Sequence, residues 1–254
     1  MKIGFYGLGH MASALVEGFL KKELCTPAQI SILAKSDETK ERARAQGFFV
    51  CDSAQELFDR TDAVILALKP AVFKDLRPAM GALDTKGTKI ISIMASISLA
   101  ELQETFSCPV LRVMPTVAVA TGHDIIGMTD PTGFEDCKLL FEKLGSVHIL
   151  DEEHLDRLTV AASCGPGFAA KVLQSYEQAC IKLGFDKEQA VAITAAVFSF
   201  AANAKGDDPF AILRRQVATP GGVTEAGNAA MGSAVEDAFD AAFQKALQKA
   251  RPAK

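Results

Sequence analysis

The chain has 254 residues, 49% of them hydrophobic, and a formal net charge of −4. This length and apolar content can fill one large or two modest cores, and the small negative charge gives no reason to expect nucleic acid or an anionic membrane as a partner. The six cysteines form no CxxC pair or histidine spacing that predicts a metal. Without a membrane-length apolar run or a cleavable signal pattern, we expect a cytoplasmic protein.

Short β-rich runs alternate with helical stretches as far as about residue 150, a pattern typical of a parallel sheet covered by helices. Several of these runs are continuously apolar, as strands buried on both faces must be. The sequence therefore predicts an α/β fold, with a Rossmann-type doubly wound parallel sheet over residues 1–151. The expected strands are Lys2–Tyr6, Ile30–Leu33, Ala63–Leu68, Lys89–Met94, Val110–Val113 and Val147–Leu150.

The remainder, residues 152–254, carries helix signals and no strand signals. Capping boxes are expected at Asp186 with Gln189 and at Ser233 with Glu236. The stretch Ala190–Ala204 is apolar nearly all round, so it needs more burial than its own domain supplies. We therefore expect an all-helical second domain that pairs two subunits, in a homodimer or a multiple of dimers.

A glycine-rich turn follows the first expected strand and opens into a helix. In Gly7-Leu8-Gly9-His10-Met11-Ala12, Gly7 permits a tight turn, Gly9 lets a pyrophosphate approach, and Ala12 allows close helix–strand packing. The helix N-terminus then offers free N–H groups to phosphate. We predict dinucleotide contacts at Gly7, Leu8, Gly9, His10 and Met11, although His10 is equally compatible with a solvated loop side chain.

Cofactor choice is predicted at the end of the second strand, which reads Ala34-Lys35-Ser36. NAD enzymes place an acidic residue there against the ribose 2′-hydroxyl. A cation and a hydroxyl instead attract a 2′-phosphate, so we expect NADP(H). Because Asp37 and Glu38 follow at once, the alternative is that Lys35 is an ordinary solvated lysine.

Four stretches together resemble the pyrroline-5-carboxylate reductase family over almost the whole chain. They are Lys2-Ile3-Gly4-Phe5-Tyr6-Gly7-Leu8-Gly9-His10-Met11, Ala67-Leu68-Lys69-Pro70, Arg112-Val113-Met114-Pro115 and Gln216-Val217-Ala218-Thr219-Pro220-Gly221-Gly222-Val223-Thr224. The resemblance implies NADPH-dependent reduction of a cyclic imino acid, pyrroline-5-carboxylate to proline. It also implies cofactor contacts at Ala67, Lys69, Pro70 and Ala95, and substrate contacts at Thr219, Pro220, Gly221, Gly222, Val223 and Thr224, with Thr224 bound to the imine nitrogen.

The proline-diglycine loop also has chemistry of its own. Pro220, Gly221 and Gly222 break regular structure, and Thr224 offers an N-cap to a helix from Glu225. Successive N–H groups at such a turn can form a nest for a carboxylate, although a plain helix connector is the alternative. Hydride transfer to a protonated imine needs mainly orientation, so neither a histidine triad nor a metal is required.

Departures from the family leave two other functions open. Met114-Pro115 continues as Thr116-Val117-Ala118 where the family has Asn-Thr-Pro, and Ala54 stands where it has asparagine. We expect Thr116 to lose or replace a polar contact at the nicotinamide or substrate. These changes motivate the second alternative, a non-catalytic dinucleotide-binding relative.

The other alternative rests on Lys171. Gly165, Gly167 and Lys171 fit the GxGxxxK spacing of β-hydroxyacid dehydrogenases, in which the lysine is general acid and base. This resemblance implies an NADP oxidoreductase that uses Lys171 catalytically. Lys171 is otherwise a solvent-reaching lysine, or a partner for an additional acidic group on the imine substrate.

Overall fold

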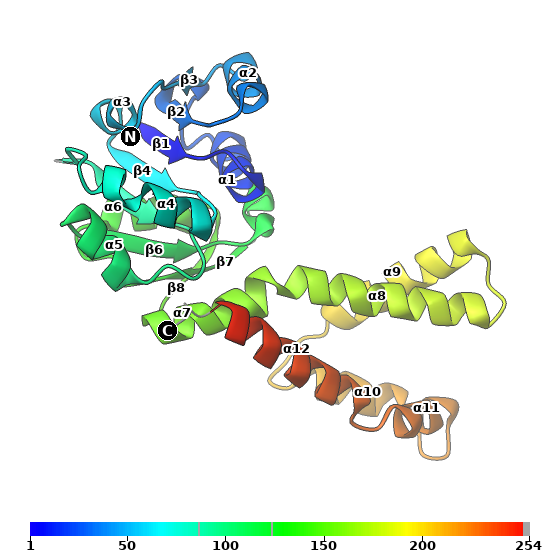
Figure 1. Cartoon of the computed structure of the whole chain (residues 1–254). Helices are drawn as coiled ribbons and strands as arrows, with labels where there is room; N and C mark the ends of the chain where they lie inside the picture. Colours follow the sequence, from blue (N-terminus) through cyan, green and yellow to red (C-terminus); the bar gives the residue numbers. More distant parts are fainter. Residues whose placement is uncertain (86, 123, 251–254) are drawn as a thin grey trace. The chain divides into compact units, whose positions relative to one another are not determined.

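The computed structural model describes residues 1–85, 87–122 and 124–250 (Figure 1). Two compact units divide the chain: residues 1–163 with 246–254 form one, and residues 164–245 form the other. The first contains the sheet and the second contains only helices. The domain division predicted after residue 151 stays a prediction, and we describe each unit by itself.

One eight-stranded sheet forms the centre of the first unit, in the order β3-β2-β1-β4-β5-β6-β7-β8. Neighbouring strands are parallel except β6 and β7, which are antiparallel. The strands are β1 Ile3–Tyr6, β2 Ile30–Leu33, β3 Phe49–Val50, β4 Ala63–Leu66, β5 Lys89–Ser92, β6 Val110–Met114, β7 Asp124–Met128 and β8 Gly145–Ile149.

Helices cover both faces of the sheet. Buried side chains of α1, α2 and α6 join one apolar cluster, and those of α3, α4 and α5 join the other. On α1, Leu15 and Phe19 are four residues apart and so lie on one helical face; the Phe19 ring packs between Phe5 and Phe141. The bounds are α1 His10–Lys21, α2 Asp37–Ala45, α3 Ala54–Arg60, α4 Pro70–Met80, α5 Leu99–Phe106 and α6 Glu135–Glu142.

Four further short elements belong to the described part of this unit. They are the 3-10 helices η1 Pro27–Gln29 and η2 Val117–Thr121, and α7 Glu152–Leu158, which runs into the π-helical turn η3 Thr159–Ser163. The C-terminal end of α12, from Ala246, also belongs to this unit.

The sequence predicted the doubly wound sheet correctly, but it missed two strands. β3 has only two residues, too few for a recognisable period. β7 starts at Asp124 and contains Gly127, both unfavourable in strands. The sheet is therefore mostly parallel rather than wholly parallel, since β7 turns back against β6.

The helical unit consists of α8 Gly165–Lys182, α9 Lys187–Ala202, α10 Pro209–Val217, α11 Val223–Met231 and most of α12 Ala234–Ala250. α8 and α9 lie side by side (Figure 1). The capping box of Asp186 with Gln189 is confirmed at the start of α9. α12 begins directly after Ser233, as expected, and the Ser233 hydroxyl hydrogen-bonds the Asp237 carboxylate.

Candidate cofactor and substrate site

The carboxyl edge of the sheet brings the predicted cofactor residues of four loops together. β1 and β4 are neighbours, and the chain leaves them in opposite directions, toward β2 and β5 respectively. Such a switch of direction opens a crevice in which open α/β sheets bind ligands. The residues beside it are Gly7, Leu8, Gly9, His10 and Met11 after β1; Ala34, Lys35 and Ser36 after β2; Ala67, Lys69 and Pro70 after β4; and Ala95 after β5.

Gly7 is required by the chain's own packing. Its φ is +99°, and a Cβ there would stand 2.7 Å from the carbonyl oxygen of Ala67. Its N–H donates to the carbonyl of Leu33 at 2.8 Å. Gly7 therefore contacts the end of β2 and the residue after β4. These contacts bring the loops after β1, β2 and β4 close together.

Gly9 differs from Gly7 in what surrounds it. Its backbone is extended, with φ −81° and ψ −171°, and a Cβ there would meet nothing within 4 Å. Neither the backbone nor protein packing therefore demands a glycine at this position. The space that the missing side chain leaves is open, as close approach of a dinucleotide requires.

The N-terminus of α1 suits an anion. Gly9 is its N-cap without a side-chain cap, and the first turn has no acidic residue. Its leading N–H groups are thus free for phosphate. Arg42 of α2 donates to the Leu8 carbonyl at 3.3 Å and adds a positive charge beside the turn. Sequence reasoning missed Arg42, although a cation on the helix after β2 was the available signal.

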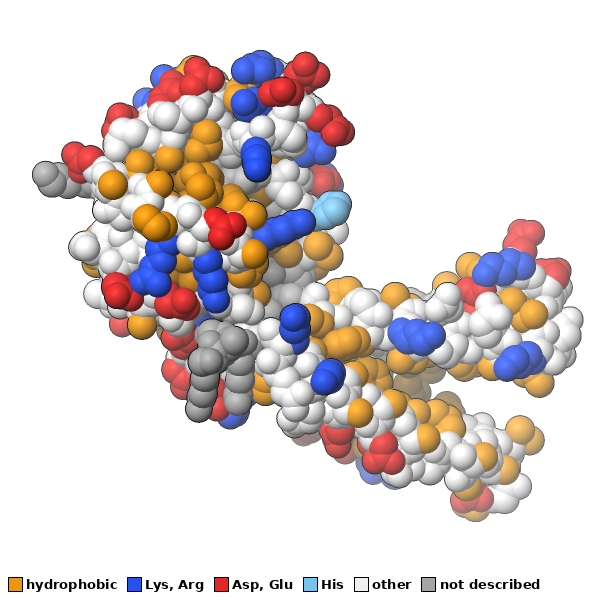
Figure 2. Space-filling view, in the orientation of Figure 1, with side chains coloured by type: hydrophobic (Ala, Val, Ile, Leu, Met, Phe, Trp, Pro, Cys, Tyr) orange, Lys and Arg blue, Asp and Glu red, His pale blue; other side chains and the backbone are white. Residues whose placement is uncertain are grey.

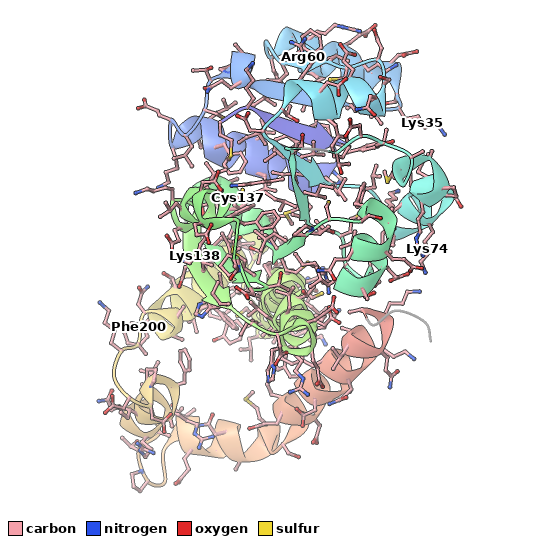
Figure 3. The ribbon with its side chains drawn as sticks, turned by 90° about the vertical axis from the view of Figure 1, so that its left-hand side faces the viewer. Lys35, Arg60, Lys74, Cys137, Lys138 and Phe200 are labelled. Atoms are coloured by element: carbon pink, nitrogen blue, oxygen red, sulfur yellow. The ribbon has the colours of Figure 1, made fainter. Side chains whose placement is uncertain are left out.

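The Lys35 and Ser36 side chains are positioned differently. Lys35 is exposed, its side chain extends away from the protein (Figure 3), and it has no ion pair within the described ranges. The Ser36 hydroxyl instead caps α2, accepting from the Thr39 N–H at 3.3 Å. Lys40 pairs with Asp37 at 3.6 Å, which offsets part of the acidic charge that follows Lys35.

Beside the glycine turn, α4 presents a second free helix start. Lys69 is its N-cap, Pro70 is its first residue, and no acidic side chain lies in the first turn. The Lys69 side chain is exposed. The α4 N-terminus and a cation therefore lie at the same edge as the α1 N-terminus.

Thr116 does not offer its hydroxyl to a ligand. The residue is 4% exposed; its hydroxyl donates to Asp124 Oδ1 at 2.6 Å, and its N–H donates to Asp124 Oδ2 at 2.8 Å. The same hydroxyl accepts from the Ala118 N–H. Burial raises the pKa of the Asp124 carboxyl. The sequence predicted that a polar contact at the nicotinamide or substrate is lost or replaced by Thr116. Because Asp124 accepts from the Thr116 hydroxyl, this structure favours the loss.

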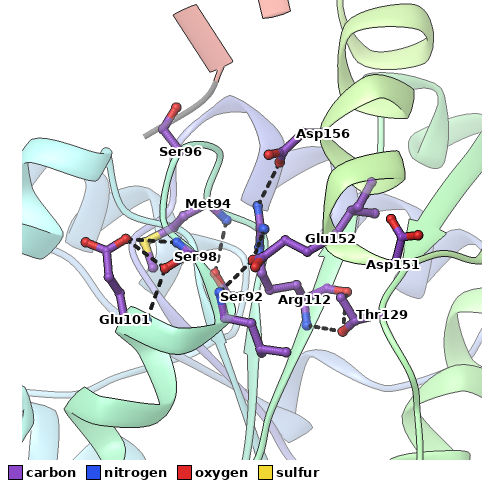
Figure 4. A network of polar contacts seen from close by, with 12 residues as sticks. Ser92, Met94, Ser96, Ser98, Glu101, Arg112, Thr129, Asp151, Glu152 and Asp156 are labelled. Carbon is purple, nitrogen blue, oxygen red and sulfur yellow. Dashed lines mark hydrogen bonds and ion pairs between the residues drawn. The ribbon is translucent and has the colours of Figure 1, made fainter. Parts of the chain in front are cut away.

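A buried arginine in β6 forms ion pairs with α7 (Figure 4). Arg112 of β6 is 1% exposed and forms ion pairs with Glu152 and, at 3.4 Å, with Asp156. Glu152 also accepts from the Leu99 N–H at the start of α5, at 2.6 Å. The Arg112 Nε has no hydrogen-bond partner. Arg112 belongs to one of the four family motifs, but no neighbouring residue in the sequence indicates this network.

The proline-diglycine loop leads into α11 two residues earlier than expected. Gly222 is the N-cap and α11 begins at Val223, so the prediction that Thr224 is the N-cap is wrong; Thr224 is the second helical residue, and it is exposed. Gly221 has φ +72°, and its N–H donates to the Glu225 carboxylate at 2.7 Å. A carboxylate therefore already binds one amide of the predicted nest.

Lys171 shares the helical unit with the proline-diglycine loop, whereas the glycine turn belongs to the sheet unit. Lys171 is exposed in the second turn of α8 and lines a hollow between α8 and α9. Neighbouring Gln174 and Glu177 line the same hollow. Its proposed catalytic role stays a prediction, as do the roles of the other site residues.

Curated relatives provide the decisive comparison. Over 240 residues the chain is 31% identical to pyrroline-5-carboxylate reductase 2 of Bacillus subtilis, covering 89% of this chain and 85% of that protein. It is 32% identical to pyrroline-5-carboxylate reductase of Staphylococcus aureus, covering 89% and 88%. The chain belongs to the pyrroline-5-carboxylate reductase family. The resemblance drawn from the four sequence motifs is thereby confirmed.

Solved structures and family models agree with membership of the pyrroline-5-carboxylate reductase family. The enzyme of Streptococcus pyogenes superposes with a TM-score of 0.82 at 29% identity over 98% of each chain. A Plasmodium falciparum pyrroline carboxylate reductase with NADP bound shares the fold, with a TM-score of 0.83 at 22% identity over 99% of this chain and 97% of that one. Residues 2–96 match the model described as NADP oxidoreductase coenzyme F420-dependent, and residues 152–253 match pyrroline-5-carboxylate reductase dimerisation.

Proposed function

We propose that the chain catalyses the NADPH-dependent reduction of pyrroline-5-carboxylate to proline. Family membership carries this proposal. The open space at Gly9 beside an uncapped helix start fits a dinucleotide, and this observation supports it independently. A non-catalytic relative and a β-hydroxyacid-dehydrogenase-like activity through Lys171 are less well supported, because the chain resembles the reductases over most of its length.

The first unit holds NADPH at the carboxyl edge. The α1 N-terminus binds the pyrophosphate, with Gly9 allowing close approach. Lys35, with Arg42 nearby, favours the 2′-phosphate. Main chain at Ala67 and Ala95 borders the nicotinamide side of the crevice. When bound, NADPH supplies the hydride.

The proline-diglycine loop holds the substrate. Its carboxylate binds the Gly221 N–H, displacing Glu225, and the leading N–H groups of α11. Thr224 hydrogen-bonds the ring nitrogen. The protonated imine carbon accepts the hydride, and the C=N π electrons become the nitrogen lone pair, which gives the secondary amine. The protein's task is therefore to orient two reactants rather than to relay protons.

Two copies of the helical unit form the dimer in this proposal. Large apolar side chains that are exposed in the single chain run along its helices (Figure 2), and Phe200 alone is 67% exposed. Exposed apolar side chains that gather on one part of a surface are typical of a protein–protein interface. The match of residues 152–253 to a dimerisation model supports the same conclusion. The exposed residues are Tyr176, Leu183, Phe185, Val191, Val197, Phe200, Phe210, Val217, Val223, Met231 and Val235.

We place the reaction in the cytoplasm, where NADPH is available to a biosynthetic reductase. None of the described helices is both long and apolar enough to cross a bilayer. Fractionation of the native host followed by immunodetection tests this assignment, and recovery of the chain in a membrane or secreted fraction contradicts it.

The reaction is tested by NADPH oxidation with pyrroline-5-carboxylate, with proline identified as the product. Thr224→Ala is expected to reduce kcat/KM at least tenfold, which corresponds to about 1.4 kcal/mol. Ser233→Ala, at an exposed position before α12 and outside the predicted site, serves as the hydroxyl-loss control. Absence of turnover by the wild-type chain overturns the proposal. Reduction of NADP by a 3-hydroxy acid that disappears in Lys171→Ala would establish the dehydrogenase alternative.

A further inference from the structure

The loop between β5 and α5, residues 93–98, lies beside the loop after β4 at the carboxyl edge. The Ile93 N–H donates to the Leu66 carbonyl at 3.2 Å, which joins the two loops at their start. Ala95 lies in its middle and is partly exposed. In the proposed function, Ala95 borders the nicotinamide, so the conformation of this loop determines where the reacting ring rests.

Ser96, the next residue, has an unusual backbone conformation. Its φ is +62°, in the left-handed region that non-glycine residues seldom adopt. Only Glu23 and Ser107 share this property among the non-glycine residues that the structure describes. A serine held there stores conformational strain, which persists only where surrounding contacts fix it.

The contact that fixes Ser96 comes from the other end of the chain. Its hydroxyl donates to the Ala250 carbonyl at 2.7 Å, across 154 positions of sequence. Ala250 is the last residue of α12, where helix carbonyls lack intrahelical donors. The Ser96 hydroxyl therefore supplies a donor to the helix end, and the Ala250 carbonyl supplies an acceptor that fixes Ser96.

A second distant contact holds the other end of the same loop. Glu152 of α7 accepts from the Leu99 N–H, directly after the loop, and is itself paired with buried Arg112 (Figure 4). α7 precedes the helical unit in the sequence, and the end of α12 follows it. Both chain segments that flank the helical unit are therefore anchored at one loop of the sheet unit.

We propose that Ser96 is a positioning residue for hydride transfer: by binding the end of α12, it fixes the main chain at Ala95 against the nicotinamide. This inference rests on the proposed function. It assigns Ser96 no contact with the reacting atoms. Its expected effect is therefore on the rate of hydride transfer rather than on cofactor affinity, most of which comes from phosphate contacts at the glycine turn.

The kinetic test compares Ser96→Ala with Ser107→Ala. Ser107 also has a left-handed φ, +51°, but it lies at the end of α5, before β6, and so at the opposite edge of the sheet. We expect Ser96→Ala to lower kcat at least tenfold, to increase the primary isotope effect with 4-deuterated NADPH, and to leave the NADPH Kd within threefold. Ser107→Ala should match the wild type in all three.

Two more variants separate the hydroxyl from the backbone conformation. Ser96→Gly adopts a positive φ freely but has no donor, so it should be as slow as Ser96→Ala. Ser96→Asn tolerates the left-handed region and its amide can donate to Ala250, so it should recover part of the rate. A wild-type rate in Ser96→Gly would show that only the backbone conformation matters and would overturn the proposal.

Hydrogen exchange decides the inference independently of turnover. Peptides covering residues 93–98 should exchange faster in Ser96→Ala than in the wild type, and NADPH should protect them less. Unchanged exchange and protection would overturn the proposal whether or not the chain reduces an imine. Faster exchange with unchanged kcat and isotope effect in an active enzyme would also overturn it, since the loop would then be held without consequence for hydride transfer.

Discussion

The carbonyl oxygen of Ala67 lies where a side chain on Gly7 would have to stand, 2.7 Å from the position of its Cβ. Gly7 also has a φ of +99°. Two strand ends therefore meet at a point that admits only glycine. Two residues later Gly9 has open space around it, so the two glycines of one motif serve different purposes.

Substitution by alanine separates these purposes. Gly7→Ala must adopt a strained backbone and displace Ala67, so we expect a loss of stability of about 1 to 3 kcal/mol together with weaker NADPH binding. Gly9→Ala should unfold at the wild-type denaturant concentration yet bind NADPH at least tenfold more weakly. Urea unfolding measures the stability of each variant, and fluorescence titration measures its NADPH affinity. Equal NADPH affinity in Gly9→Ala and the wild type would contradict the role assigned to Gly9.

Lys35→Asp should reverse the cofactor preference. A carboxylate at this position repels the 2′-phosphate and can bind a ribose 2′-hydroxyl, so kcat/KM should fall at least tenfold with NADPH and rise with NADH. Lys143→Asp, at an exposed lysine just before β8, is the charge-matched control. A parallel loss with both cofactors would mean that Lys35 acts on folding rather than on selectivity.

Arg112→Met should destabilise the sheet unit strongly. Methionine removes the buried cation that pairs with Glu152 and Asp156. Because the Glu152 side chain is 37% exposed and can be solvated, the expected loss is about 1 to 3 kcal/mol, less than for a fully buried pair. The control is Arg77→Met, whose pair with Glu104 is far more exposed and is worth less than about 1 kcal/mol. Equal midpoints of urea unfolding for both variants would refute the importance of the buried network.

The pair of Lys89 and Asp136 predicts a defined dependence of stability on pH. The hydrogen bond from Lys89 lowers the pKa of the Asp136 carboxyl below its ordinary 3.8, and the same bond raises the pKa of Lys89 above 10.5. The stability from Asp136 is therefore present above pH 3.8 and lost as the pH falls through its lowered pKa. The stability from Lys89 is present below pH 10.5 and lost as the pH rises through its raised pKa.

Lys89→Met tests this dependence. Because both side chains are at least one third exposed, the loss at pH 7 should be less than about 1 kcal/mol. It should shrink as the pH falls through the lowered pKa of Asp136, because a protonated Asp136 no longer forms an ion pair with Lys89. Unfolding free energies measured in denaturant across this range give the difference, and a constant difference down to pH 2 would contradict the assignment.

Local patterns determined much of this protein from its sequence alone. The glycine turn, most strands, the capping box at Asp186 and the family motifs each depend on residues close together in the chain, so short-range sterics and hydrogen bonding specify them. The predicted cofactor residues lie at one edge because parallel strands bring their carboxyl ends together, and their contacts with a cofactor stay predictions.

Tertiary structure alone decided what depends on distant contacts. Nothing near Thr116 in the sequence shows that Asp124 takes its hydroxyl, and nothing near Ser96 shows that the end of α12 holds it. In the sequence, Arg112 is indistinguishable from an exposed charged residue. In the fold it is buried, so it needs the ion pairs with Glu152 and Asp156 of α7. Buried polar groups must find partners wherever the fold provides them, and the fold provides these from remote segments.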